Sequence, residues 1–115
     1  LRPVRLAFER NCYFRAPVQT ALGAVGIPWQ MAVESDSSRT VEATVSADLA
    51  IHACIESAIP PYFEQVPHHG TLPELIGITI NMYLAEGPKR ALIERFAEIV
   101  RDAYGAEEPK VMAAE

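Results

Sequence analysis

The sequence predicts an α/β domain in which helices cover both faces of a mainly parallel, Rossmann-like sheet. Short β-rich runs alternate with segments whose apolar residues recur every three or four positions, and this alternation is typical of parallel crossovers. The chain has 115 residues, half of them hydrophobic, which is enough for one core and too little for two. The hydrophobic half, a charged fraction of 22% and a mean hydropathy of +0.06 together exclude a disordered tail or a solvated linker.

The first strand-to-helix unit occupies residues 4–26. Residues 4–8 form a short β-rich run, and from Phe14 onward apolar residues recur at helical spacing until Gly26. We expect the helix to start within residues 12–16, with Asn11 as its N-cap.

A second unit follows with the same order. Residues 29–33 form the next strand, and residues 34–38 are acidic or serine, as is typical of a helix start. A short helix ends near Ala47, and residues 49–55 alternate like a third strand.

The second half is less regular. A short edge strand is predicted at residues 63–66 and a loop at 68–70. Residues 76–84 alternate apolar and polar side chains, which predicts a long strand. A helix is expected over residues 89–104, and residues 105–115 have the composition of a frayed tail.

Charge and hydropathy exclude two classes of partner. The net charge is −5 and the pI is near 5.2, whereas a phosphate backbone or an anionic membrane would require a basic face. No apolar run approaches the roughly 20 residues of a membrane span. We therefore expect no contact with DNA or membrane from this chain itself.

The cysteine content indicates the cellular compartment, and the first residues indicate whether the chain is part of a longer protein. Cys12 and Cys54 lie in apolar sequence surroundings. This favours free thiols in a cytoplasmic protein over disulfide bonds in a secreted one. The chain begins at Leu1 with neither an initiator Met nor a signal segment, so we expect it to be part of a longer protein.

Two strand-to-helix turns, at residues 8–13 and 33–38, are the best candidates for a binding site. Ligands of open α/β sheets bind outside the carboxyl ends of the strands, where helix N-termini offer N–H groups to a carboxylate or another small anion. Asn11 and Ser37 fit this role. The alternative is that both residues only cap helices.

Catalysis has little support in the sequence. Cys12 and His52 could form a nucleophile and base, but the local sequence matches no nucleophile turn, and His52 is better read as a core or cleft-lining residue. His68 and His69 lack the spacing of metal ligands, and no glycine-rich phosphate loop follows a strand. We expect no enzyme activity, no metal and no cofactor.

The last helix carries more apolar residues than one small sheet requires. They stand at 91, 92, 93, 96, 97, 99, 100 and 103. A stripe of this width predicts a partner surface outside the helix's own sheet. We expect concentration-dependent self-association of the chain by pairing of a sheet edge at residues 29–33, with Trp29, Met31, Leu92 and Phe96 as apolar surface candidates.

Residues 4–15 and 21–37, followed by 45–51, resemble the second lobe of the effector-binding domain of LysR-type transcriptional regulators. The resemblance runs from the Cys-x-x-Arg turn through a helix ending in Gly-Ile to an acidic-serine turn. The chain departs from the family where Asp48 and Ala50 replace two glycines. Asp tolerates a left-handed backbone, whereas Ala50 narrows any close approach of a ligand to the backbone, so no ligand contacts are assigned to residues 50–52.

The resemblance implies a fold like the type 2 periplasmic binding proteins, with a small-molecule effector held between two lobes. Residues 1–104 would be the second lobe with the return strand 76–84 and the C-terminal helix 89–104, which would pack on lobe one. The N-terminal DNA-binding winged helix-turn-helix and most of lobe one would lie outside this chain. DNA would be bound only through that missing domain, by a homodimer or homotetramer.

The resemblance and the turns together give five candidate effector-binding residues. They are Asn11, Cys12, Tyr13, Ser35 and Ser37. Side chains of the asparagine and the serines would hydrogen-bond the effector. The N–H groups of residues 12 and 13 would bind the anionic end of an anionic effector, and the tyrosine would form one wall of the pocket. Two other classes stay open: one lobe of an exported solute-binding protein, and one lobe of an α/β enzyme.

Overall fold

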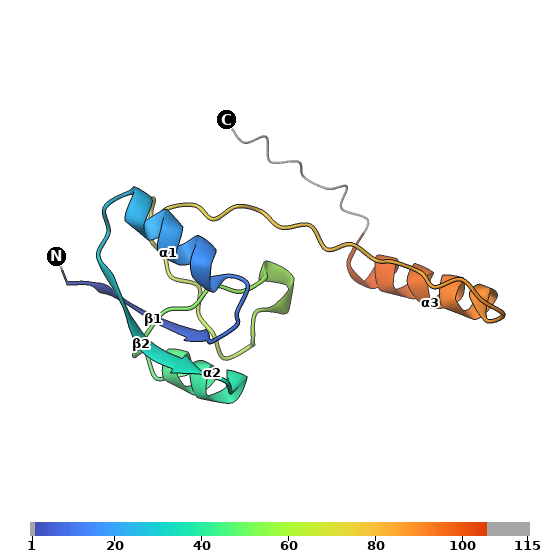
Figure 1. Ribbon diagram of the computed structural model, residues 1–115, viewed down its shortest axis with the longest axis horizontal. Helices are drawn as coiled ribbons and strands as arrows, with labels where there is room; N and C mark the ends of the chain where they lie inside the picture. The colour runs from blue at the N-terminus through green and yellow to red at the C-terminus, as the bar shows by residue number, and fades with distance from the viewer. Residues whose placement is uncertain (1, 106–115) are drawn as a thin grey trace. The chain divides into compact units, whose positions relative to one another are not determined.

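The structure is a computed structural model that describes residues 2–105. It divides into two units, one ending at Ile76 and one starting at Gly77, and each is described by itself. The first unit holds two strands, two α-helices and a short 3-10 helix, η1 (Glu56–Ala58), and the second holds one α-helix (Figure 1). Among the described residues, no helix has the length and apolar character to span a membrane.

Two parallel strands form the sheet of the first unit. β1 (Val4–Glu9) pairs with β2 (Trp29–Ser35), and the register shifts by one residue between Leu6 and Ala7. The other edge of β1 makes a single parallel bridge to Ile51. β1 is therefore the central segment, and the predicted strands at 4–8 and 29–33 are confirmed.

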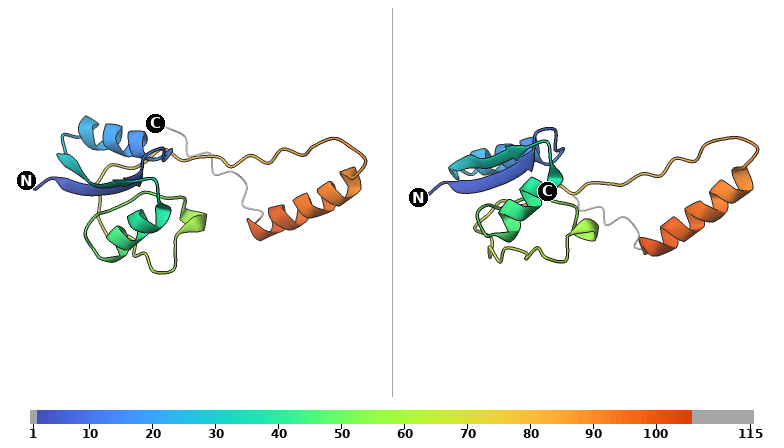
Figure 2. Two further views of the ribbon diagram at one scale, coloured as in Figure 1. Left: turned by 60° about the horizontal axis from the view of Figure 1, so that its bottom comes forward. Right: turned by 90° about the horizontal axis from the view of Figure 1, so that it is seen from below.

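Helices α1 (Arg15–Ala24) and α2 (Ser38–Ser46) pack on opposite faces of this sheet (Figure 2). Successive side chains of a strand point to opposite faces, so β1 contributes buried side chains to the contact with each helix. Leu6 and Phe8 are fully buried in one core cluster that also contains α1 residues Val18 and Leu22. Ala7 is buried on the other face with α2 residue Val41 and with Ala50. The prediction of a mixed α/β fold is confirmed, with a smaller sheet than expected.

The third strand, predicted over residues 49–55, is reduced to one bridging residue. Ile51 donates its N–H to the Arg5 oxygen at 2.8 Å and accepts the Ala7 N–H at 3.0 Å, and no further ladder bond follows among the described residues. The turn before it has the expected backbone, because Asp48 adopts φ 59°. Alternating hydropathy thus indicated that this segment runs beside the sheet, but not how many of its residues pair with β1.

The predicted strands at residues 63–66 and 76–84 are wrong. Neither segment is paired with another strand in the described part of the chain, and residues 76–83 are exposed to solvent. A strand exists only with a hydrogen-bonded neighbour, and alternation of side chains does not supply one. The loop predicted at 68–70 is confirmed as a turn.

Helix α3 (Arg90–Ala103) confirms the helix predicted at 89–104 to within one residue at each end. It follows Gly87, at φ 150°, and it ends before Gly105, at φ 74°, a conformation that favours glycine. Of the predicted tail, residues 106–115 lie outside the described residues.

Candidate functional site

The two predicted turns meet at the carboxyl edge of the sheet. β1 and β2 are parallel and end side by side, with Glu9 opposite Ser35. The Arg10 N–H donates to the Ser35 oxygen at 3.0 Å, one step beyond the last strand pair. Residues 9 and 10 of the first turn therefore lie beside residues 34–36 of the second.

Side-chain ion pairs connect the two turns. Arg10 Nε donates to Asp36 Oδ1 at 3.1 Å, and Arg10 Nη1 lies 3.5 Å from Glu34 Oε1. Arg15, in the first turn of α1, pairs with the other Glu34 oxygen and also donates to the Arg10 main-chain oxygen at 3.3 Å. The sequence-based prediction missed this network, although the arginines after the first strand (Arg10 and Arg15) and the carboxylates after the second (Glu34 and Asp36) were a usable signal.

The first turn differs from expectation at the helix start. The Cys12 N–H donates to the Glu9 oxygen at 3.1 Å, and the Arg15 N–H donates to the Cys12 oxygen at 3.2 Å. These bonds form an extra turn before α1, so the N-cap position falls on Phe14, with no side-chain cap bond. The predicted N-cap role of Asn11 is wrong, because Asn11 lies three residues too early.

The same turn changes what its residues offer to a ligand. The Cys12 N–H, expected to hold an anion, is already bonded, and the Cys12 side chain packs against the core. Tyr13 is 74% exposed and meets Phe14 edge-on, with ring centroids 5.6 Å apart. Asn11 is exposed beside it. Asn11 and Tyr13 are thus accessible at the edge, and Cys12 mainly shapes the turn.

The second turn holds Ser35 and Ser37 as predicted. Ser37 is the N-cap residue of α2, with an extended backbone at φ −106° and ψ 117°, but its hydroxyl makes no cap bond. Ser35 Oγ accepts the Ser37 N–H at 3.0 Å and so fixes the turn. The capping alternative therefore holds for the position of Ser37 and not for its side chain.

His52 follows the Ile51 bridge, on the other side of β1 from β2. Its Nδ1 lies 2.7 Å from the Ala7 oxygen, and its ring centroid is 4.7 Å from that of Phe8 and 6.4 Å from that of Phe63. A carbonyl oxygen only accepts hydrogen bonds, so Nδ1 carries the hydrogen and Nε2 is an acceptor in the neutral ring. This fits the cleft-lining or core role that the sequence favoured.

The cysteines and the metal-ligating side chains are the remaining candidates for chemistry. Cys12 and Cys54 are both free and half-buried, and burial raises the pKa of the Cys54 thiol, which disfavours the thiolate. The described residues contain no group of three or more His, Cys, Asp or Glu side chains placed to hold a metal.

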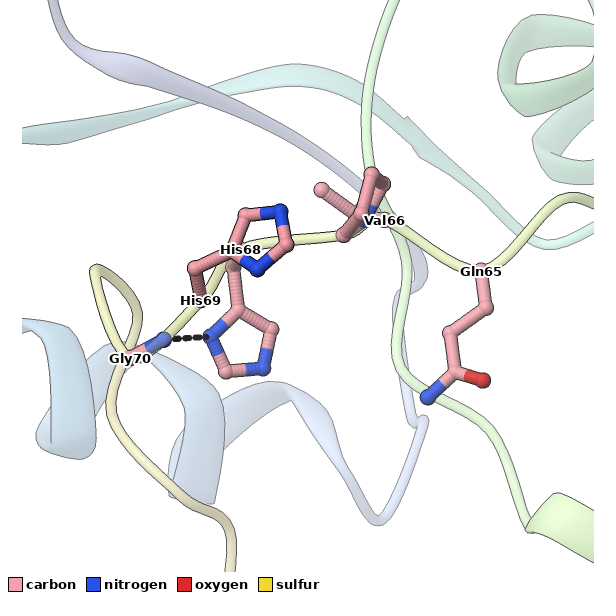
Figure 3. Close-up of a pocket in the computed structure, with 6 residues that line it drawn as sticks. Gln65, Val66, His68, His69 and Gly70 are labelled. Atoms are coloured by element: carbon pink, nitrogen blue, oxygen red, sulfur yellow. Dashed lines mark hydrogen bonds between the residues drawn. The ribbon is translucent and has the colours of Figure 1, made fainter.

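A shallow hollow of about 380 Å³ lies elsewhere, along residues 65–70 (Figure 3). Its lining includes His68, whose Nδ1 accepts the Gly70 N–H at 3.2 Å. No residue of the two turns lines this hollow, and it is open to solvent.

Comparisons with protein-family models, with curated proteins and with solved structures found no match to this chain.

Proposed function

We propose that this chain is the effector-sensing part of a bacterial LysR-type transcriptional regulator, and that the carboxyl edge of its sheet is one side of a small-molecule site. The observation that carries the proposal is the meeting of the two turns after adjacent parallel strands, joined by Arg10 and Asp36. The segments that resemble the family, residues 4–15, 21–37 and 45–51, contain β1, β2, the two turns that follow these strands and the Ile51 bridge. Ligands of open α/β sheets bind at such an edge.

The edge would recognise an effector mainly through uncharged polar groups. The Asn11 amide and the Ser37 hydroxyl make no capping bonds, and Tyr13 provides an exposed aromatic wall. Arg10 and Arg15 are both engaged by carboxylates. An anionic effector would therefore have to replace Asp36 or Glu34 at a guanidinium, whereas a neutral one would leave the ion pairs in place.

Regulation would follow from a population shift. An effector that contacts this edge and a second lobe stabilises their closed arrangement, and the equilibrium moves by the difference in its affinity for the two arrangements. In a dimer or tetramer, that closure would change the spacing of the DNA-binding domains.

The binding half of the proposal is tested by recording amide spectra of the isotope-labelled chain during titration with succinate and with its uncharged diamide. We expect shifts at residues 10–13 and 35–37 with at least one of the two compounds, reduced in the double variant Asn11→Ala/Ser37→Ala. The matched control is Gln65→Ala, in the separate hollow. Amide chemical-shift changes confined to residues 65–70, or no changes at any reachable concentration of either compound, would overturn the proposed site.

The regulatory half is tested by the coding sequence upstream of Leu1. A winged helix-turn-helix there supports the proposal. An export signal or an enzyme domain in its place would contradict it and favour a solute-binding or catalytic lobe.

A further inference from the structure

Helix α3 has two apolar faces about a quarter turn apart. Ile93, Ala97 and Val100 are half-buried or buried. The other face is exposed: Leu92 by 67%, Phe96 by 65% and Ile99 by 53%. A helix that buried its apolar residues only against its own unit would not need the second face.

The exposed face has the spacing of a helix–helix seam. Leu92, Phe96, Ile99 and Ala103 follow one another at intervals of four, three and four residues, which is the spacing of the a and d positions in a heptad. These four residues are called the seam below. They form a straight stripe along nearly the whole of α3.

Side-chain size favours an antiparallel partner with the same seam. Antiparallel pairing about the middle of the seam places Leu92 opposite Ala103 of the second copy, and Phe96 opposite Ile99. Each layer then combines a larger with a smaller residue. Parallel pairing stacks Phe96 on Phe96 and Ala103 on Ala103, which crowds one layer and leaves a gap in the other.

Charge along the seam favours the same arrangement. Arg95 and Asp102 border one side of the seam, seven residues apart, and Ile93 and Val100 border the other. In the antiparallel pair, Arg95 lies near Asp102 of the second copy, and this contact occurs twice. In a parallel pair, each charged border would face the apolar border of the partner.

We propose that the α3 seam is a self-association surface, on which a second copy of this chain docks through its own α3 in antiparallel orientation. This surface involves only residues of α3 and does not rest on the proposed function. In a LysR-type regulator, lobe one would compete with a second copy for this helix, because the C-terminal helix would pack on lobe one. The association should be weak and reversible. A 14-residue helix with four seam residues buries far less than the roughly 800 Å² per partner of a stable interface. Border charges select orientation more than they add affinity.

Sedimentation equilibrium of the 115-residue chain tests the surface. We expect a monomer–dimer equilibrium that Phe96→Glu shifts to monomer. Tyr13→Glu, which changes an equally exposed aromatic residue in the other unit, should leave the equilibrium unchanged. Far-UV circular dichroism of both variants verifies that α3 is retained. A parent chain that stays monomeric at every accessible concentration, or a Phe96→Glu variant that dimerises as well as the parent, overturns the proposal.

Charge reversal tests the orientation. In an antiparallel pair, Arg95→Glu places two acidic side chains together at each end, and Asp102→Arg places two basic ones together. Each single variant should dimerise at least about threefold more weakly than the parent. An equimolar mixture of the two variants, and the double variant Arg95→Glu/Asp102→Arg, should regain the parent affinity. Failure of both to recover would exclude antiparallel pairing, and parallel packing or a different partner would then be indicated.

Discussion

His52 Nδ1 bonds to the Ala7 main-chain oxygen at 2.7 Å, directly after the single residue, Ile51, that bridges to β1. In a parallel ladder that continued past the Leu6–Ile51 bridge, the Ala53 N–H would donate to that oxygen. In the structure the imidazole bonds to that oxygen, and the pairing of β1 with this segment consists of the Ile51 bridge. The His52 ring lies at the carboxyl edge of the sheet, next to the ring of Phe8.

Replacing His52 should destabilise the first unit. Ala7 is fully buried, so loss of the imidazole donor leaves a buried oxygen without a partner, at a cost of about 1–3 kcal/mol. His52→Phe keeps a ring against Phe8 but removes the donor. Urea unfolding of His52→Ala and His52→Phe should show a loss of stability in both. If His52→Phe is as stable as the parent, the hydrogen bond contributes nothing and only packing matters.

The two ion pairs at the candidate site should differ in strength. Arg15 and Glu34 are each about two-thirds or more shielded, whereas Arg10 and Asp36 are mostly exposed. Exposed pairs contribute about 0.2–1 kcal/mol, and shielding reduces screening by salt. Double-mutant cycles with alanine should give a larger coupling energy for Arg15–Glu34 than for Arg10–Asp36. The opposite order, or equal sensitivity to added salt, would contradict this explanation.

Tyr62 should titrate above its ordinary pKa near 10. Its hydroxyl donates to Glu42 Oε2 at 2.7 Å, and this hydrogen bond is the main reason that the pKa of Tyr62 is raised; burial and the charge of Glu42 add to it, and Arg39 opposes it. Since the folded state holds the proton more tightly, the bond's contribution to stability is complete below pH about 10 and is lost as pH rises through the raised value.

The Tyr62 titration can be followed by the chemical shifts of its ring during an alkaline pH series. Glu42→Gln should lower the midpoint toward the ordinary value, because it removes the negative charge that opposes ionisation. Arg39→Gln should move the midpoint the other way. An unchanged midpoint in Glu42→Gln would show that the bond to Glu42 does not control the titration.

Asn11→Ala should leave stability nearly unchanged. A lost N-cap costs about 0.5–2 kcal/mol, but Asn11 is exposed and precedes the actual cap position, Phe14. Surface changes away from such features stay within about 0.5 kcal/mol. Thermal unfolding of Asn11→Ala beside Asn11→Asp measures this. A loss above about 1 kcal/mol in the alanine variant alone would restore a capping role to Asn11.

Local patterns in the sequence determined the helices and the first two strands. Apolar residues at helical spacing, together with stop residues such as Gly26 and Gly105, placed α1, α2 and α3 to within a few residues. The runs at β1 and β2 were recognisable because both strands carry apolar side chains that pack against α1 on one face of the sheet and α2 on the other. The convergence of the two turns followed from parallel strand order alone.

Only the tertiary structure decided where strand pairing stops and which groups each turn exposes to a ligand. The alternation at residues 49–55 and 76–84 is a property of the chain, but a strand also needs a hydrogen-bonded neighbour, and the first of these segments pairs with β1 only at Ile51. The position of the α1 cap depended on an extra turn closed by Cys12 and Glu9. Hydrogen bonds and ion pairs between residues far apart in sequence, such as Arg10 and Asp36, form only once β1 and β2 lie side by side.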